Sequence, residues 1–209
     1  MIDNCASGGR RIDIETLRRS VPLWRTDYCC PADFLEDGVQ CHHLSFNQWM
    51  PYSGTGGGRP YDTYRIRSAY SPALTTNYAF SERESFGDDP EKMRWLKERL
   101  EEYLRVRPMM EEDFYPLTQV SDRKDIWSAA QFDRPSKGDG LLQFFRRENA
   151  PYEKACYSLC AIDPQKDYVF TDADDGREFL IRGAELKEKG FSLSMPQKRS
   201  SKLYFYYKK

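Results

Sequence analysis

Two short segments near the start of the chain constrain its fold most. Residues 4–13 read Asn-Cys-Ala-Ser-Gly-Gly-Arg-Arg-Ile-Asp, and residues 21–27 read Val-Pro-Leu-Trp-Arg-Thr-Asp. Together they predict a strand end, a glycine-rich loop, a short helix over 13–20 and a buried parallel strand over 21–26. An active-site-like loop so close to Met1 leaves no room upstream for the scaffold that it needs. We therefore expect the chain to be the C-terminal portion of a larger enzyme.

The following residues predict further helices and one loop. Apolar and aromatic residues favour a helix over 40–50, and the many glycines of 52–60 predict a loop. A helical segment is expected over 68–77, and Pro72 would have to start or kink it. The clearest helix covers 88–107, because Asp89 precedes Pro90, apolar residues follow at helical spacing and Pro108 ends the pattern.

After about Thr118 the pattern changes to short aromatic-rich segments separated by turn residues. Evenly spaced strands of this kind predict an antiparallel sandwich. We therefore predict an α/β region over 1–118, followed by an all-β domain over 119–209. The expected strands cover 125–133, 140–146, 157–161, 168–171, 178–182, 191–195 and 201–207.

Composition excludes several classes of function. The 32 Lys and Arg residues against 33 Asp and Glu residues give a net charge of −1, which argues against nucleic acid or an anionic membrane as a partner. We find no basic leader followed by an apolar run, and no apolar stretch near the ~18 residues of a membrane span. The six cysteines are scattered along the chain, so we expect reduced thiols in a cytoplasmic protein.

Asp27 is the main candidate for catalysis. A carboxylate just after a buried parallel strand occupies the place where α/β barrels carry their active sites. Partial burial against Trp24 and Tyr28 would raise its pKa toward that of a general acid. A structural Asp that caps the next loop is the alternative. Cys5 and Gly8 lie in the preceding loop, where glycine lets the backbone approach a ligand. From these residues alone, a tight turn with a buried Cys5 is the favoured interpretation.

Other polar clusters carry weaker signals. Cys29-Cys30 and Cys41-His42-His43 lack the spacing of structural zinc sites. The run Asp172-Ala-Asp-Asp-Gly176 lacks the closing Glu of a calcium loop, and a hairpin turn explains it better. We expect neither a metal nor a cofactor.

Several motifs in one order closely resemble the C-terminal part of glycoside hydrolase family 36. The resemblance covers essentially the whole chain. It is carried by residues 4–13 and 24–27, by Met-Pro-Tyr-Ser-Gly-Thr-Gly at 50–56, by Tyr-Pro-Leu-Thr at 115–118, by Trp-Ser-Ala-Ala-Gln-Phe-Asp-Arg-Pro at 127–135 and by Gly-Leu-Leu-Gln-Phe-Phe-Arg-Arg at 140–147.

This resemblance implies a retaining α-galactosidase, with some family members acting on N-acetylgalactosamine. It implies the last strands and helices of a (β/α)8 barrel, beginning at about the seventh strand, followed by a C-terminal antiparallel β-sandwich. Asp27 matches the family's general acid/base, and Cys5 and Gly8 match positions that line the galactose subsite. Tyr28 and Cys29 depart from the Asp-Asn pair that often follows the acid/base. The implied ligand is an α-galactoside oligosaccharide, and a homo-oligomer is possible.

The resemblance also implies an incomplete catalytic pair. The family's nucleophile is an Asp in a Lys-x-Asp motif on an earlier barrel strand, and no region of this chain matches it. Two barrel strands cannot close a barrel, so we expect a foldable sandwich joined to a poorly supported barrel remnant. Two functions follow: part of an α-galactosidase that needs the upstream barrel, or a non-catalytic carbohydrate-binding or remnant protein that uses aromatics of the sandwich.

Overall fold

The computed structural model describes all residues except 1, 6–9, 32, 51, 58–60 and 77–88. The chain forms two compact units, Met1–Glu111 and Glu112–Lys209. The expected boundary after residue 118 lies within the second unit, because strand β3 (Asp113–Pro116) pairs with β4 (Trp127–Arg134). Among the described residues, no helix has the length and apolar character needed to cross a membrane.

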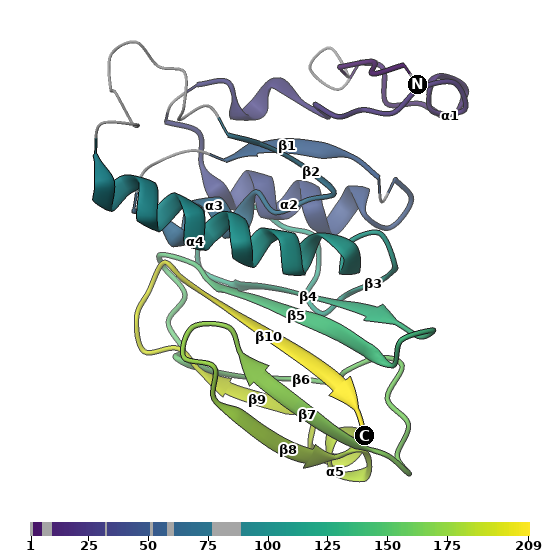
Figure 1. Cartoon of the computed structure of the whole chain (residues 1–209), viewed down its shortest axis with the longest axis vertical. Helices are drawn as coiled ribbons and strands as arrows, with labels where there is room; N and C mark the ends of the chain where they lie inside the picture. Colours follow the sequence, from purple (N-terminus) through teal and green to yellow (C-terminus); the bar gives the residue numbers. More distant parts are fainter. Residues whose placement is uncertain (1, 6–9, 32, 51, 58–60, 77–88) are drawn as a thin grey trace. The chain divides into compact units, whose positions relative to one another are not determined.

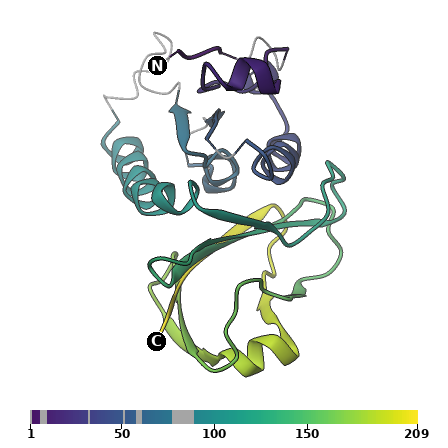
Figure 2. The same cartoon turned by 90° about the vertical axis from the view of Figure 1, so that its right-hand side faces the viewer.

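The first unit alternates parallel strand segments with helices. Its helices are α1 (Ile14–Leu17), α2 (Glu36–Phe46), α3 (Thr63–Ser68) and α4 (Pro90–Val106), with the short 3-10 helix η1 at Asp27–Cys29. In Figure 2 these helices surround the strands of the unit. The 3-10 helix η4 (Arg107–Met109) follows α4 and ends the unit.

Four segments of the first unit run parallel in sequence order. Residues 2–4 pair with Val21 through a parallel bridge between Asp3 and Val21. Gly54 joins the 21–25 segment to β1 (Gly54–Gly57), since it donates to Pro22 O and accepts from Arg25 N. Strand β1 then pairs in parallel with β2 (Ala73–Thr76). The expectation of only two parallel segments is therefore wrong, and the described residues of the unit form four strand-helix repeats.

Two predictions for this unit are corrected. The segment expected as a loop over 52–60 contains β1, and its glycines are what permit the pairing. A Cβ on Gly54 would lie 1.8 Å from the carbonyl oxygen of Leu23, so only glycine allows the backbones this close. The prediction of a helix over 68–77 is wrong, because helix α3 ends at Ser68 and strand β2 begins directly after Pro72.

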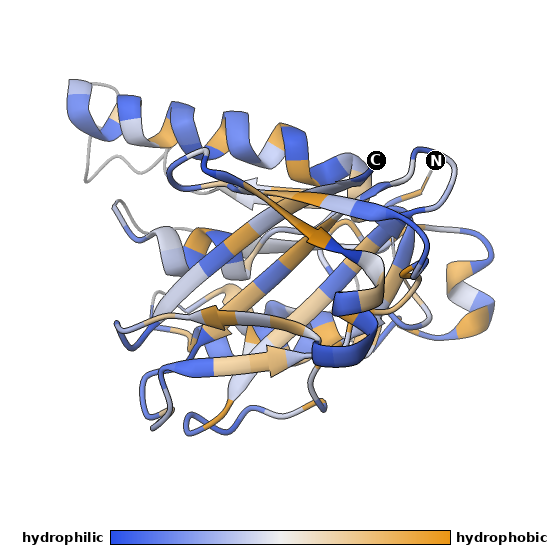
Figure 3. Ribbon diagram, turned by 90° about the horizontal axis from the view of Figure 1, so that it is seen from below, coloured by the Kyte–Doolittle hydropathy of each residue, from blue (hydrophilic) through white to orange (hydrophobic). Residues whose placement is uncertain are grey.

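The helix predicted over 88–107 is confirmed as α4. The Asp89 side chain accepts hydrogen bonds from the N–H groups of Glu91 and Lys92, and Pro90 occupies the first turn. Orange and blue residues alternate along this longest helix in Figure 3, as expected for a helix with one apolar face. Of the shorter helix expected over 13–20, only Ile14–Leu17 is helical, as α1, and the Asp13 side chain caps it.

The second unit is an antiparallel sandwich. Its large sheet has the order β3-β4-β5-β10-β7-β8, and a second sheet pairs β6 with β9 (Figure 1). The remaining bounds are β5 (Asp139–Arg146), β6 (Lys154–Tyr157), β7 (Asp167–Asp172), β8 (Glu178–Arg182), α5 (Gly183–Lys189), β9 (Phe191–Ser194) and β10 (Ser200–Lys208). Six expected strands are confirmed within a few residues. The one expected over 157–161 is wrong, because β6 lies earlier, and β3 and α5 were not expected.

Aromatic rings fill the space between the two sheets. Phe144 of β5 stacks on Phe191 of β9, with ring centroids 5.7 Å apart and an interplanar angle of 6°. Phe170 of β7 lies 4.9 Å from the same Phe191 ring. All three side chains are at most 1% exposed, so the sandwich has a core of its own.

Candidate functional site

The ends of the first two parallel segments are held side by side by Asp3. Its carboxylate Oδ1 accepts the backbone N–H of Cys5 at 3.0 Å and that of Leu23 at 3.2 Å. The Asn4 N–H also donates to Val21 O at 3.1 Å. The segment that leads to Cys5 and the segment that leads to Asp27 therefore leave the set of parallel segments side by side. Sequence reasoning missed Asp3, whose only signal was its place directly before the motif.

Asp27 begins the short helix η1 at the end of the second segment. The side chain of Thr26 caps this helix by accepting the N–H of Tyr28. The indole N–H of Trp24 donates to Asp27 Oδ1 at 3.0 Å. The Trp24 ring fits against Gly56 of β1, where a Cβ would come within 2.7 Å of it. Trp24 is therefore placed by the neighbouring strand and in turn holds the Asp27 carboxylate.

The surroundings of Asp27 differ from the prediction in one respect. We expected partial burial against Trp24 and Tyr28, but Asp27 is exposed in this chain. The Tyr28 ring packs instead toward α2, edge-on to His42 at 5.2 Å. A carboxylate with one indole donor and an open face can still receive a ligand from solvent.

Cys5 and Cys30 lie near Asp27. Partial desolvation raises the pKa of the Cys30 thiol, and the charges of Asp27, Cys29 and Cys5 raise it further. The geometric link between the two residues is Asp3, whose carboxylate holds the segment that carries Cys5 beside the segment that carries Asp27. Cys5 is exposed and has a positive φ of 47°, so the alternative of a buried structural Cys5 is wrong. Gly8 lies outside the described residues.

Beneath Asp27, Arg25 is completely buried between the second segment and α2. Its Nη1 donates to Ser53 Oγ at 3.3 Å, and its guanidinium lies 5.8 Å from the centroid of the Phe46 ring. Burial lowers its pKa to about 10, which leaves it charged at neutral pH. In the described part of the chain, its Nε and Nη2 have no hydrogen-bond partner. Sequence reasoning did not single out this residue.

Both histidines of the sequence lie on α2, and both make the stability of the folded chain depend on pH. Burial lowers the pKa of His42 to about 4 and that of His43 well below its usual 6.5, and Arg25 lowers both further. A base with a lower pKa in the folded state binds fewer protons when folded, so stability falls as the pH decreases from about 6.5 to about 4. We expect the thermal midpoint to fall between pH 7 and pH 5.

The variant His42→Phe should make this fall smaller, because Phe keeps the ring contacts with Tyr28 and Phe46 and cannot bind a proton. Thermal melts followed by circular dichroism at both pH values measure the difference. An equal fall in the wild type and the variant would contradict the assignment to His42.

Two further motifs are structural. Lys202 Nζ lies 2.6 Å from Asp172 Oδ2 and 3.0 Å from Asp174 Oδ2, so an ammonium group already neutralises the acidic turn between β7 and β8. The expected hairpin is confirmed there. The sequence holds one Lys-x-Asp triplet, at 137–139, in the hairpin between β4 and β5, where Asp139 pairs with Arg134. Among the described residues, no group of three or more His, Cys, Asp or Glu side chains is arranged to hold a metal ion.

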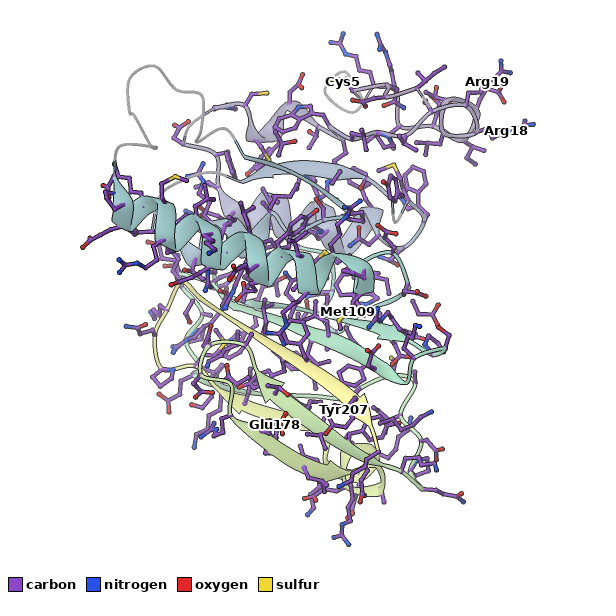
Figure 4. All side chains as sticks on the ribbon, in the orientation of Figure 1. Cys5, Arg18, Arg19, Met109, Glu178 and Tyr207 are labelled. Atoms are coloured by element: carbon purple, nitrogen blue, oxygen red, sulfur yellow. The ribbon has the colours of Figure 1, made fainter. Side chains whose placement is uncertain are left out.

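Figure 4 shows where the labelled side chains of the first unit lie. Cys5 lies on the N-terminal segment, and Arg18 and Arg19 extend outward from the end of α1. Both arginines are more than 70% exposed and pair with Glu15 of the same helix. They therefore belong to the outer surface and not to the strand ends that carry Cys5 and Asp27.

Comparison with known proteins gives no sequence match and a clear structural one. No protein-family model matches the sequence. No curated protein matches it. The galactosidase domain of the α-galactosidase-sucrose kinase AgaSK aligns with 95% of this chain at a TM-score of 0.66 and 16% identity. The α-galactosidase AgaB of Geobacillus stearothermophilus, of glycoside hydrolase family 36, aligns with 81% at a TM-score of 0.56 and 15% identity.

The alignments cover only part of those proteins. This chain spans 27% of the AgaSK structure and 24% of AgaB. A variant of AgaA from the same Geobacillus species, crystallised with raffinose, aligns over 81% of this chain and 24% of its own, with 15% identity and a TM-score of 0.54. At these identities the match establishes the fold. The chain therefore has the fold of about a quarter of a family 36 α-galactosidase.

Proposed function

We propose that this chain supplies the general acid/base, Asp27, of a retaining α-galactosidase. The observation that carries the proposal is the placement of Asp27 and Cys5 after adjacent parallel strands of a strand-helix array. Catalytic residues of α/β barrels lie at such strand ends. The four repeats would then be half of an eight-stranded barrel, and its two open edges, at residues 2–4 and at β2, would pair with the other half.

The chemistry needs one carboxylate from this chain and one from outside the sequence. Retaining glycosidases place their two carboxyl groups about 5 Å apart. The second carboxylate attacks the anomeric carbon and forms the galactosyl-enzyme, while Asp27 gives its proton to the departing oxygen. Asp27 then takes a proton from water as the water oxygen attacks the anomeric carbon, which releases galactose and restores both carboxyl groups.

Three residues would position these steps. The indole N–H of Trp24 orients Asp27, so Trp24 is a positioning residue. Cys5 would line the subsite for the terminal galactose, with Gly8 allowing the backbone to approach the sugar. The structures of AgaA variants with raffinose and stachyose support galactose-containing oligosaccharides as the ligand class.

A chimeric enzyme tests the proposal. The matching quarter of the AgaSK galactosidase domain is replaced by this chain, and the same domain without that quarter is the control. We expect the chimera to hydrolyse raffinose and to release galactose first as the α-anomer, which proton NMR detects before mutarotation. A folded chimera that releases the β-anomer, or that is as inactive as the control, would refute the proposal.

A further inference from the structure

The sandwich carries a hollow beside β6 that the proposed active site does not use. Its volume is about 440 Å³. Ligand sites in proteins measure roughly 300–1,000 Å³ and combine aromatic walls with a few polar groups. The lining includes side chains of both kinds from three segments of the second unit: Gln119, Ile126, Trp127, Tyr152, Lys154 and Tyr157.

The aromatic wall of the hollow is fixed in place. The indole N–H of Trp127 donates to the backbone oxygen of Tyr152 at 3.0 Å, and Trp127 is only 9% exposed. Tyr157 stacks on Phe144 of the core, with centroids 5.3 Å apart. The Tyr152 side chain itself is 77% exposed, although its backbone is tied to Trp127. The hollow therefore offers one open ring next to two anchored ones.

Three polar side chains of the hollow have no partner in the described part of the chain. The Gln119 amide, the Lys154 ammonium and the Tyr157 hydroxyl make no hydrogen bond or ion pair there. Two other polar groups are engaged, since Thr118 Oγ1 accepts from Ala129 N and Cys156 Sγ donates to Lys189 O. By contrast, the Gln131 amide of β4 bonds to Cys160 and Tyr206, and Lys202 of β10 pairs with two aspartates. Three polar groups therefore remain at the hollow to contact a ligand.

A second hollow of about 440 Å³ adjoins the first. It shares Lys154, Ala155 and Cys156 with it and is bounded on its other side by Ser192 and Ser194 of β9. A ligand that lies across β6 can therefore reach both hollows. Its length would exceed that of a single sugar ring.

We propose that this surface, the β6 hollow, binds a neutral oligosaccharide outside the catalytic centre. The open Tyr152 ring would stack on the C–H face of a pyranose, as amphipathic aromatic rings do. The Gln119 amide, the Lys154 ammonium and the Tyr157 hydroxyl would bond to sugar hydroxyls. No carboxylate lines either hollow. The three N–H donors of the Lys154 ammonium are therefore available to hydroxyl oxygens of the ligand. The proposal concerns the second unit alone and does not depend on the role of Asp27.

Titration of the full-length chain with stachyose tests the β6 hollow. Saturation-transfer NMR measures binding, and Tyr152→Ala is expected to weaken it at least tenfold, with Gln119→Ala weakening it less. Tyr207→Ala is the matched control, because Tyr207 on β10 is also exposed but lies outside both hollows (Figure 4). It should leave the affinity unchanged.

Four results would overturn the proposal. The first is no saturable binding of stachyose by the wild type. The second is equal binding by the wild type and by a Tyr152→Ala variant that keeps the wild-type thermal midpoint. The third is displacement of stachyose by inorganic sulfate, which would make the hollow an anion site at Lys154. Binding lost in Asp27→Asn but kept in Tyr152→Ala would also reject the β6 hollow, while leaving the proposed catalytic function intact.

Discussion

Asp27→Asn should lower kcat for raffinose about 100- to 10,000-fold in the chimeric enzyme, the range that a general acid/base contributes. Asn keeps the shape of the side chain and can still contact the Trp24 indole, but it cannot give a proton to the departing oxygen. A p-nitrophenyl galactoside has a leaving group that needs little protonation. Its first step, the burst of p-nitrophenol, should therefore be much less affected than raffinose hydrolysis.

Asp33→Asn is the control for Asp27→Asn, because Asp33 is exposed in the same unit and carries no proposed role. It should leave the rates of hydrolysis of both substrates unchanged. Steady-state rates on both substrates and the burst phase on the aryl galactoside provide the measurements. Raffinose hydrolysis at the wild-type rate in Asp27→Asn would remove Asp27 from the mechanism.

Local signals were enough to predict elements whose stabilising contacts lie close in sequence. Helix α4 was recognised from Asp89, Pro90 and the apolar spacing, and each of those features acts within a turn or two. The hairpin between β7 and β8 was recognised from its turn residues, with Gly176 at a φ of 71°. Alternation and turn chemistry likewise placed most strands of the sandwich.

Elements that depend on distant partners could not be predicted in this way. Glycine usually argues against a strand, but Gly54 is required because a backbone oxygen of Leu23, far away in sequence, occupies the space of a side chain. Strand β2 is secured by Tyr103 of α4, whose hydroxyl lies 3.2 Å from Leu74 N and 2.9 Å from Ser71 O. Neither neighbour is visible from the local sequence, so both segments were assigned to the wrong class.

The candidate site shows the same division. Asp27 and Cys5 were chosen from motifs, and the structure brings them to one neighbourhood. Asp3 and Arg25 were missed because their roles arise from pairing between segments: Asp3 holds two strand ends together, and Arg25 is buried under α2. The exposure of Asp27 could not be foreseen either, because the Tyr28 ring packs against His42 of α2, a neighbour that the local sequence does not reveal.

Glu102→Gln should destabilise the first unit by about 3–5 kcal/mol, the usual cost of removing one partner from a buried ion pair. Glu102 of α4 accepts two hydrogen bonds from Arg67 of α3, at 2.9 and 2.6 Å, and one from the Tyr70 hydroxyl at 2.8 Å. The Arg67 side chain is 1% exposed, so Glu102→Gln takes a carboxylate partner away from a buried charge.

The neighbouring Glu101→Gln is the matched control for Glu102→Gln. Glu101 is 64% exposed and lies 3.9 Å from Lys97, so its loss should cost less than about 1 kcal/mol. Denaturant unfolding gives the free energies, and amide hydrogen exchange should show lost protection in α3 and α4 while the sandwich core keeps its own.

Replacing both Arg67 and Glu102 by Met should restore much of the stability, because it removes the buried charge as well as the bond. Equal stability of the two single variants would mean that the Arg67–Glu102 pair does not hold these helices together.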